Sequence, residues 1–135
     1  SILELAHESN RRALEMASRA NREAMKAARE MIRAASEAAR RAGSSNDKDS
    51  LRMIEEALRL ALRMIEETNK KAVRMVLENN RKMVEAEKKK LSEEEIKRIA
   101  KETEDRMREI ARRASEEARR LAEEIKREAD YRSGS

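Results

Sequence analysis

Residues 91–96 read Leu-Ser-Glu-Glu-Glu-Ile and carry the start signal of a helix. The Ser92 hydroxyl can accept a hydrogen bond from the backbone N–H of Glu95 while the Glu95 side chain reaches back, which is the arrangement called a capping box. Leu91 and Ile96 stand on either side of the box at the spacing of a hydrophobic staple. The stretch therefore predicts that one helix ends before it and that another begins near residue 93.

A second break lies at residues 43–47, which read Gly-Ser-Ser-Asn-Asp. Glycine is typical of the residue after a helix, and Asn or Asp of the residue before one. The two breaks predict three helices, at about 2–42, 47–90 and 93–131, each roughly 60 Å long at 1.5 Å per residue. Short connections favour antiparallel neighbours. The predicted fold class is all-α, an up-down-up three-helix subunit of a larger helical bundle, with residues 1–131 as a single domain.

The composition of the 135-residue chain excludes several classes of protein. There is no Cys, which excludes a disulfide scaffold, a cysteine zinc site and a thiol nucleophile. The net charge of +5 comes from 33 basic and 28 acidic residues spread along the chain, and only 1% of residues are aromatic, so we expect no nucleic-acid partner. No apolar run reaches the roughly 18–20 residues of a membrane span, so we expect no membrane partner either.

The apolar faces of the three predicted helices differ in width. Placed at about 100° per residue, the third helix has one narrow apolar stripe, whereas the first two are apolar over more of their circumference than a three-helix core needs. We interpret the excess as a contact with another copy of the chain, a dimer with a four-helix inner layer being favoured and a trimer being the alternative. The other interpretation is that alanine fills these positions for its helix propensity. The candidate interface residues are Leu14, Ala17, Ala24, Ala28, Leu60 and Met64.

Asn, Thr and Ser residues interrupt these apolar faces at regular positions. Asn10 and Asn21 lie about three helical turns apart, and so do Asn69 and Asn80. Because the chain folds back at each break, residues equally far from a break along the sequence lie at the same height along the bundle axis. Counted in this way, the polar residues fall at two heights. Buried amides at one height are best explained as bonding one another and so setting the register of the helices. The first predicted layer contains Asn10, Asn79, Asn80 and Thr103, and the second contains Asn21, Thr68, Asn69 and, at the rim of its stripe, Ser115.

The capping box, the near-absence of Gly and Pro, the equal helix lengths and the Asn/Thr layers resemble de novo designed helical bundles with buried hydrogen-bond networks. The resemblance covers the whole chain and is one of style, without a diagnostic motif. It implies a homo-oligomeric, coiled-coil-like assembly without natural activity or natural compartment, soluble when expressed in a recombinant cytoplasm. By the same resemblance, Ser1 is a tag-cleavage remnant and residues 132–135 are a linker remnant.

Groups suited to catalysis are scarce. His7 is the only histidine, and no nucleophile or orienting carboxylate shares its face, so we expect no enzyme, no metal and no cofactor. His7 is a candidate pH-sensitive group, or a plain member of the polar network or of the surface. An alternative function to self-association is a binding module that accepts a separate helix or a small ligand in the groove between the first two helices.

Overall fold

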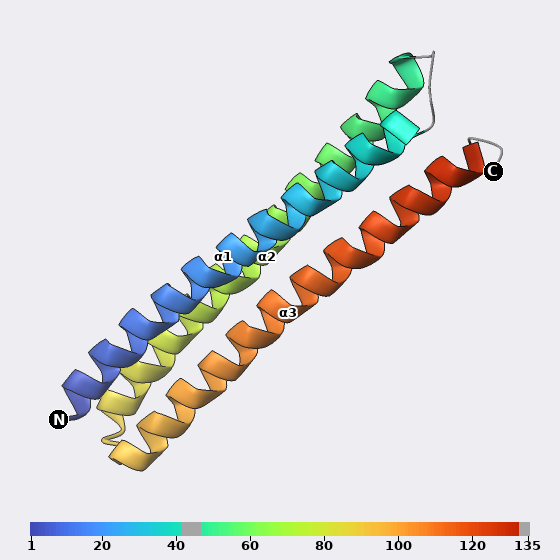
Figure 1. Ribbon diagram of the computed structural model, residues 1–135. Helices are drawn as coiled ribbons and strands as arrows, with labels where there is room; N and C mark the ends of the chain where they lie inside the picture. Colours follow the sequence, from blue (N-terminus) through green and yellow to red (C-terminus); the bar gives the residue numbers. More distant parts are fainter. Residues whose placement is uncertain (42–46, 133–135) are drawn as a thin grey trace. The chain divides into compact units, whose positions relative to one another are not determined.

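A computed structural model describes residues 1–41 and 47–132 of the chain. It contains three helices, α1 (Ile2–Arg41), α2 (Asp47–Lys88) and α3 (Glu93–Arg132), and no strand among the described residues (Figure 1). The protein is an all-α three-helix bundle whose helix order fits an up-down-up path, so the predicted fold class is confirmed at this level. The caps predicted between residues 43 and 46 lie outside the described residues.

The end of α2 differs from the prediction, since the helix stops at Lys88 rather than at residue 90. Lys90 has a φ of 53°, in the left-handed region. Its N–H donates to the carbonyl of Glu87 (3.2 Å), and the N–H of Leu91 donates to the carbonyl of Ala86 (3.0 Å). This pair of bonds is the Schellman motif, which usually has Gly at the left-handed residue. Because lysine occupies that position here, the sequence lacks the glycine that would mark the last residue of the helix.

Replacing Lys90 by glycine is therefore expected to stabilise the fold. A left-handed conformation costs a residue with a Cβ about 1 kcal/mol relative to glycine, and the greater freedom of glycine in the unfolded chain offsets part of this gain. We expect the free energy of unfolding, measured by chemical denaturation, to rise by roughly 0.5 kcal/mol. The matched control is Lys89→Gly, which lies before the left-handed residue and is expected to give no gain. Equal effects of the two substitutions would contradict the assignment.

The predicted capping box organises the start of α3. The N–H of Glu95 donates to Ser92 Oγ (3.3 Å), which is the first half of the box. Leu91 packs against the buried cluster that contains Ile96 and Ala86. Leu91 therefore packs against a cluster that joins the end of α2 to the start of α3.

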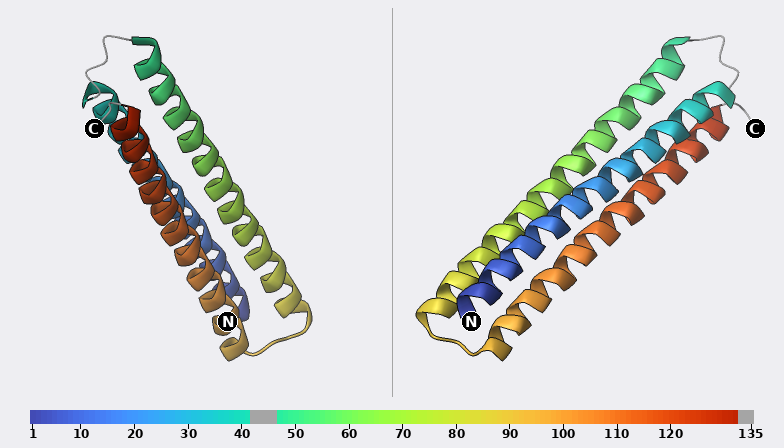
Figure 2. Two further views of the ribbon diagram at one scale, coloured as in Figure 1. Left: turned by 90° about the vertical axis from the view of Figure 1, so that its right-hand side faces the viewer. Right: turned by 60° about the vertical axis from the view of Figure 1, so that its left-hand side comes forward.

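The contacts of the chain form two compact units, and each takes a segment from every helix. Unit 1 consists of Ser1–Arg22 with Thr68–Arg112, and unit 2 of Glu23–Glu67 with Arg113–Ser135. Within each unit the segments of α1, α2 and α3 lie side by side (Figure 2). The single domain over residues 1–131 stays a prediction, and the units are described separately below.

Buried positions recur about every three turns along each helix. A spacing of about 11 residues makes three turns of roughly 3.67 residues, close to the 3.6 of a straight α-helix, so one face stays inward along the helix. The buried series are Ser9, Ala20 and Met31 on α1, Asn79, Thr68 and Ala57 on α2, and Thr103, Ala114 and Ile125 on α3. In each series the first residue named is polar and the last is apolar.

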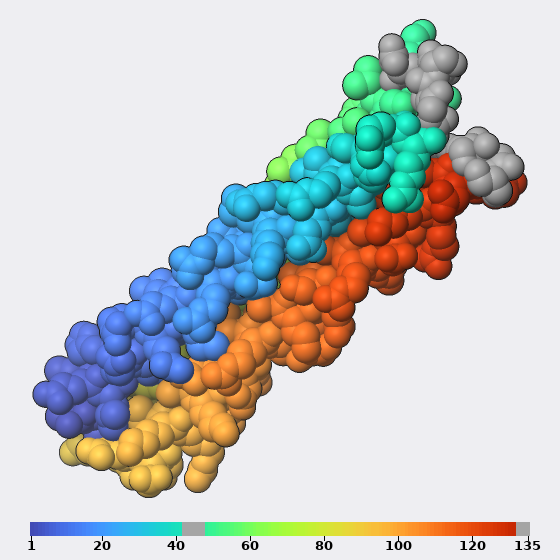
Figure 3. Space-filling model, in the orientation of Figure 1, coloured from blue at the N-terminus to red at the C-terminus, as the bar shows by residue number. Residues whose placement is uncertain are grey.

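Small side chains dominate the interior of both units. In unit 1 the buried clusters centre on Met16, Met107 and Ile96, with alanines between them. In unit 2 the clusters centre on Met31 and Met64, again among alanines. Alanine allows neighbouring helices to approach closely, and Figure 3 shows the side chains of α1 and α3 meeting along one face. The described interior therefore consists mainly of alanine and methionine, and most leucines and valines lie at other positions.

Candidate functional site

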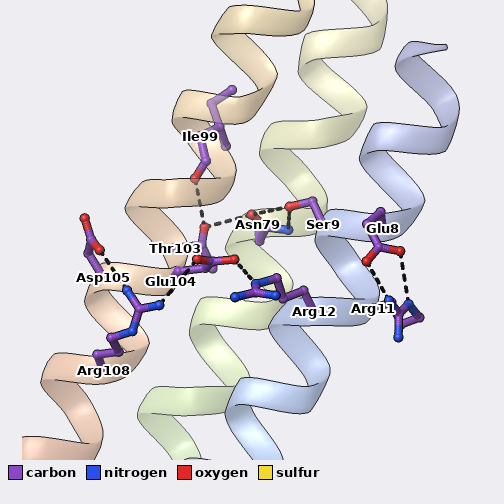
Figure 4. A network of polar contacts seen from close by, with 10 residues as sticks. All are labelled: Glu8, Ser9, Arg11, Arg12, Asn79, Ile99, Thr103, Glu104, Asp105 and Arg108. Atoms are coloured by element: carbon purple, nitrogen blue, oxygen red, sulfur yellow. Dashed lines mark hydrogen bonds and ion pairs between the residues drawn. The ribbon is translucent and has the colours of Figure 1, made fainter.

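The candidate site of unit 1 is a polar layer that crosses all three helices. At its centre the side chain of Asn79 from α2 lies between Ser9 of α1 and Thr103 of α3 (Figure 4). Thr103 Oγ1 donates to Asn79 Oδ1 (2.7 Å), and Asn79 Nδ2 donates to Ser9 Oγ (3.1 Å). Asn79 is 0% exposed, Thr103 4% and Ser9 9%. Hydrogen-bonded polar side chains therefore occupy the centre of unit 1, where apolar side chains would be usual.

A second amide connects this centre to the surface between α1 and α2. The carbonyl Oδ1 of Asn10 accepts a hydrogen bond from Asn79 Nδ2 (2.9 Å), and Asn10 Nδ2 donates to Asn80 Oδ1 (3.0 Å). Asn10 is half-buried and Asn80 is exposed. Both N–H groups and the carbonyl of Asn79 are thus bonded, and no fully buried polar side-chain atom of the described residues lacks a partner. A buried amide satisfied in this way avoids the cost of about 1–3 kcal/mol of an unpaired one.

Ion pairs extend the layer toward both sides of α3. Arg12 of α1 pairs with Glu104 (Figure 4). Oε2 of Glu104 also lies 3.7 Å from Nη2 of Arg108. On the other side, Glu78 of α2 lies 3.7 Å from Arg106. These groups are partly exposed, and each such pair contributes only about 0.2–1 kcal/mol. Together they connect the rim of the layer to α3.

Charged groups on the outside of α1 pair along the helix. Arg11 donates to both carboxylate oxygens of Glu8 (Figure 4), and this hydrogen bonding holds the pKa of Glu8 below its ordinary value. The same contact raises the pKa of Arg11. In unit 2 a hydrogen bond from Arg40 likewise lowers the pKa of Glu37. A carboxylate with a lowered pKa stabilises the folded state above its unfolded pKa, so the contribution of these pairs is lost as the pH falls through the lowered pKa.

The structure brings together all four residues of the first predicted layer. Asn10, Asn79, Asn80 and Thr103 are joined by the hydrogen bonds given above. The sequence analysis missed Ser9, because a serine beside charged residues is typical of a helix surface. The repeating series that continues with Ala20 and Met31 is the signal that places Ser9 inside.

The second predicted group is not joined by hydrogen bonds among the described residues. Thr68 is 5% exposed, whereas Asn21 and Ser115 are half-buried and Asn69 is exposed. Ser115 directly follows Ala114, which holds the buried position of α3. One residue turns the side chain by about 100° around the helix, so Ser115 lies at the rim. The expectation of a second buried layer is therefore corrected to a buried threonine with amides nearer the surface.

The candidate interface residues divide into two sets. Ala24, Ala28 and Met64 are 0%, 3% and 4% exposed, so contacts within the chain cover them and the expectation that they face another copy is corrected. Ala17 and Leu60 are half-buried, and Leu60 borders a hollow that Leu121 and Ile125 of α3 also line. Leu14 is 59% exposed. His7 lies exposed on the surface rather than in a buried layer.

An apolar surface on α1 and α2, here called the outer face, stays uncovered. Its members are large, apolar and at least 40% exposed, and most of them recur about every three turns. They are Leu3, Leu14 and Met25 on α1, and Leu51, Leu58, Leu62, Val73, Leu77 and Val84 on α2. The only comparable residue in the described part of α3 is Tyr131. Asn10 lies on the same side of α1 as the apolar residues of the outer face, and Asn80 on the same side of α2. The polar layer therefore reaches the outer face.

Three further observations concern ligand, metal and membrane sites in the described part of the chain. The charged side chains of Glu23, Lys26 and Arg119 line a hollow of about 150 Å³. No group of three or more His, Cys, Asp or Glu residues among those described is arranged to hold a metal ion. Within residues 1–41 and 47–132, no helix has the length and apolar character that crossing a bilayer requires.

The fold and the polar layer define a three-helix bundle protein with a hydrogen-bonded Asn/Ser/Thr centre. Comparison of the chain with models of protein families, with curated proteins and with solved structures finds no match.

Proposed function

We propose that the protein is a self-assembling structural protein whose copies associate through the outer face of α1 and α2. A dimer with a four-helix inner layer is the favoured assembly, and a trimer is the alternative. The proposal includes no catalytic step and no cofactor, in keeping with the designed bundles that the sequence resembles.

The observation that supports this proposal most directly is the distribution of leucine and valine. Alanine and methionine dominate the interior, with Ile96, Leu121 and Ile125 as the buried branched residues, while Leu62 and Leu77 are 60% and 64% exposed. A chain in water that exposes a row of large apolar side chains on two helices tends to associate, because covering that row removes it from water. The exposed positions of α3 carry mostly charged residues instead, so association through α1 and α2 leaves α3 on the outside.

The polar layer supports association in one register. Asn80 accepts a hydrogen bond from Asn10, but its own side-chain N–H groups have no partner among the described residues. Asn21 and Asn69 likewise have no side-chain hydrogen bond in the described part of the chain. When an apolar face is covered, amides within it need partners, and a second copy in the correct alignment supplies identical amides.

Mass in solution as a function of concentration tests the proposal. Native mass spectrometry and light scattering of the unmodified chain are expected to give a dimer or trimer at micromolar concentration, with no added partner. A monomer at that concentration would contradict self-association. The chain would then be tested as a receptor for a separate amphipathic helix, with the outer face as the groove.

A further inference from the structure

We propose that residues 113–132, the part of α3 that belongs to unit 2, form a releasable cover that opens by local unfolding while unit 1 stays folded. This opening is distinct from the proposed self-association, because it uncovers the inside of unit 2 rather than the outer face. The two parts of α3 are attached to α1 and α2 in different ways, and this difference supports the proposal.

In unit 1, large apolar side chains attach α3 to its neighbours. Ile96 and Met107 are each 1% exposed. The partly buried Ile99 and Ile110 pack against the clusters that contain them. Because the free energy gained by burial grows with the apolar area removed from water, each of these side chains contributes far more than an alanine at the same place would.

Polar contacts between helices reinforce the attachment of α3 in unit 1. Thr103 Oγ1 donates to Asn79 Oδ1 of α2 (2.7 Å), and both residues are buried. Beside this bond, Glu104 pairs with Arg12 of α1. Opening the unit 1 part of α3 would therefore break the centre of the polar layer as well as its apolar contacts.

In unit 2, alanine provides most of the buried positions of α3. They include Ala114, Ala118 and Ala129. Among residues 113–132, Leu121 and Ile125 are the buried large apolar side chains, and each is 9% exposed. Since an alanine buries little apolar area, two side chains supply most of the apolar attachment of this segment.

The packing around residues 113–132 is also incomplete. A hollow of about 50 Å³ lies between Leu60 of α2 and Leu121 of α3. The hollow of about 150 Å³ described above lies between α1 and α3. Arg120 pairs with Glu124 of its own helix, so this ion pair does not attach α3 to a neighbour. Low contact density of this kind is typical of segments that open locally.

Release of the cover exposes part of the interior of unit 2. Ala61, Met64 and Met31 share one buried cluster with Ala118 and Leu121 of α3, so they lose their cover when residues 113–132 open. The hydrogen bonds of the polar layer lie in unit 1 and remain formed. The protein therefore exposes a buried apolar surface without unfolding its hydrogen-bonded centre.

Thiol labelling measures this opening, because the chain has no cysteine of its own. Ala61→Cys and Ala72→Cys form a matched pair, since the two alanines lie three turns apart on α2 and are 2% and 1% exposed. Ala61 packs with Leu121 in unit 2, and Ala72 packs with Met107 in unit 1. Under native conditions we expect Ala61→Cys to react about tenfold faster or more. Equal rates, or a faster reaction of Ala72→Cys, would overturn the proposal.

A substitution in unit 1 separates local opening from unfolding of the whole chain. The contacts of Ile96 persist when residues 113–132 open, so Ile96→Ala makes whole-chain unfolding easier without favouring the local opening. We expect it to accelerate the labelling of Ala72→Cys by about tenfold and to leave that of Ala61→Cys within about twofold of its rate without the substitution. Equal acceleration of both cysteines would show that they react through the same unfolded state, and would overturn the local opening.

Hydrogen exchange of the unmodified chain tests the same opening without any substitution. The backbone N–H groups of residues 115–128 are expected to exchange about tenfold faster or more than those of residues 97–110, although both stretches lie within one helix. Equal or slower exchange of residues 115–128 would contradict the proposal.

Discussion

Asn79→Leu is expected to lower the free energy of unfolding by about 3 kcal/mol, more than any other single substitution in the polar layer. The substitution removes the acceptor for Thr103 and the donor for Ser9 and Asn10. Ser9 then keeps a buried hydroxyl without a partner, and an unpaired buried polar group costs about 1–3 kcal/mol. Thr103 loses less, because its hydroxyl lies 3.3 Å from the carbonyl of Ile99. Chemical denaturation at one fixed protein concentration measures the change.

The matched control is Thr68→Val, three turns earlier on the same face of α2. Thr68 is buried but has no side-chain hydrogen bond among the described residues, so the expected loss is below about 1 kcal/mol. A triple apolar replacement, Ser9→Ala with Asn79→Leu and Thr103→Val, leaves no orphaned hydroxyl, and only the half-buried Asn10 loses its bond to Asn79. It is expected to recover most of the loss. If Asn79→Leu were no more destabilising than Thr68→Val, the layer would not be the bonded unit described here.

Leu62→Glu together with Val73→Glu is expected to weaken self-association by at least 100-fold. Each side chain is exposed in the single chain, so both substitutions should change the stability of the monomer by no more than about 0.5 kcal/mol per site. In the assembly they replace apolar surface worth roughly 1.5–3 kcal/mol per side chain and introduce two covered carboxylates. Together these losses exceed the free energy of roughly 2.8 kcal/mol that corresponds to a 100-fold change in the dissociation constant.

Sedimentation over a range of concentrations measures this change, and circular dichroism checks that the helices are retained. Tyr131→Glu is the matched control, because it also replaces an exposed apolar residue by glutamate but lies on α3 outside the outer face. It is expected to leave the dissociation constant within about threefold of the parent value. Equal weakening by both variants, or none by the double variant, would contradict the assignment of the interface to α1 and α2.

Local signals along the chain account for most of the fold. Ser92 and Glu95 mark the start of α3. Counting residues from the two breaks predicts that Asn79 lies at the same height as Asn10 and Thr103. Where local signals mislead, the cause is specific. Lys90 adopts the left-handed conformation that glycine usually provides, so no glycine marks the exact end of α2. Ser115 lies one residue from the buried position that the prediction assigned to it. This difference places its side chain at the rim, because each residue turns the helix by about 100°.

The three helices, their order and the heights at which polar residues recur follow from the sequence alone, because they depend on caps and on helical periodicity. Which part of each broad apolar surface is covered depends instead on how the helices pack. Alanine suits a core and an interface equally, so Ala24 and Ala28 could not be assigned until α3 was placed against the other helices. Packing within the chain buries these alanines and Met64, with Ala28 and Met64 in one cluster with Leu121 of α3, and it leaves Leu14 outside. Packing also turns Ser9 inward, where its hydroxyl completes the bonds of Asn79.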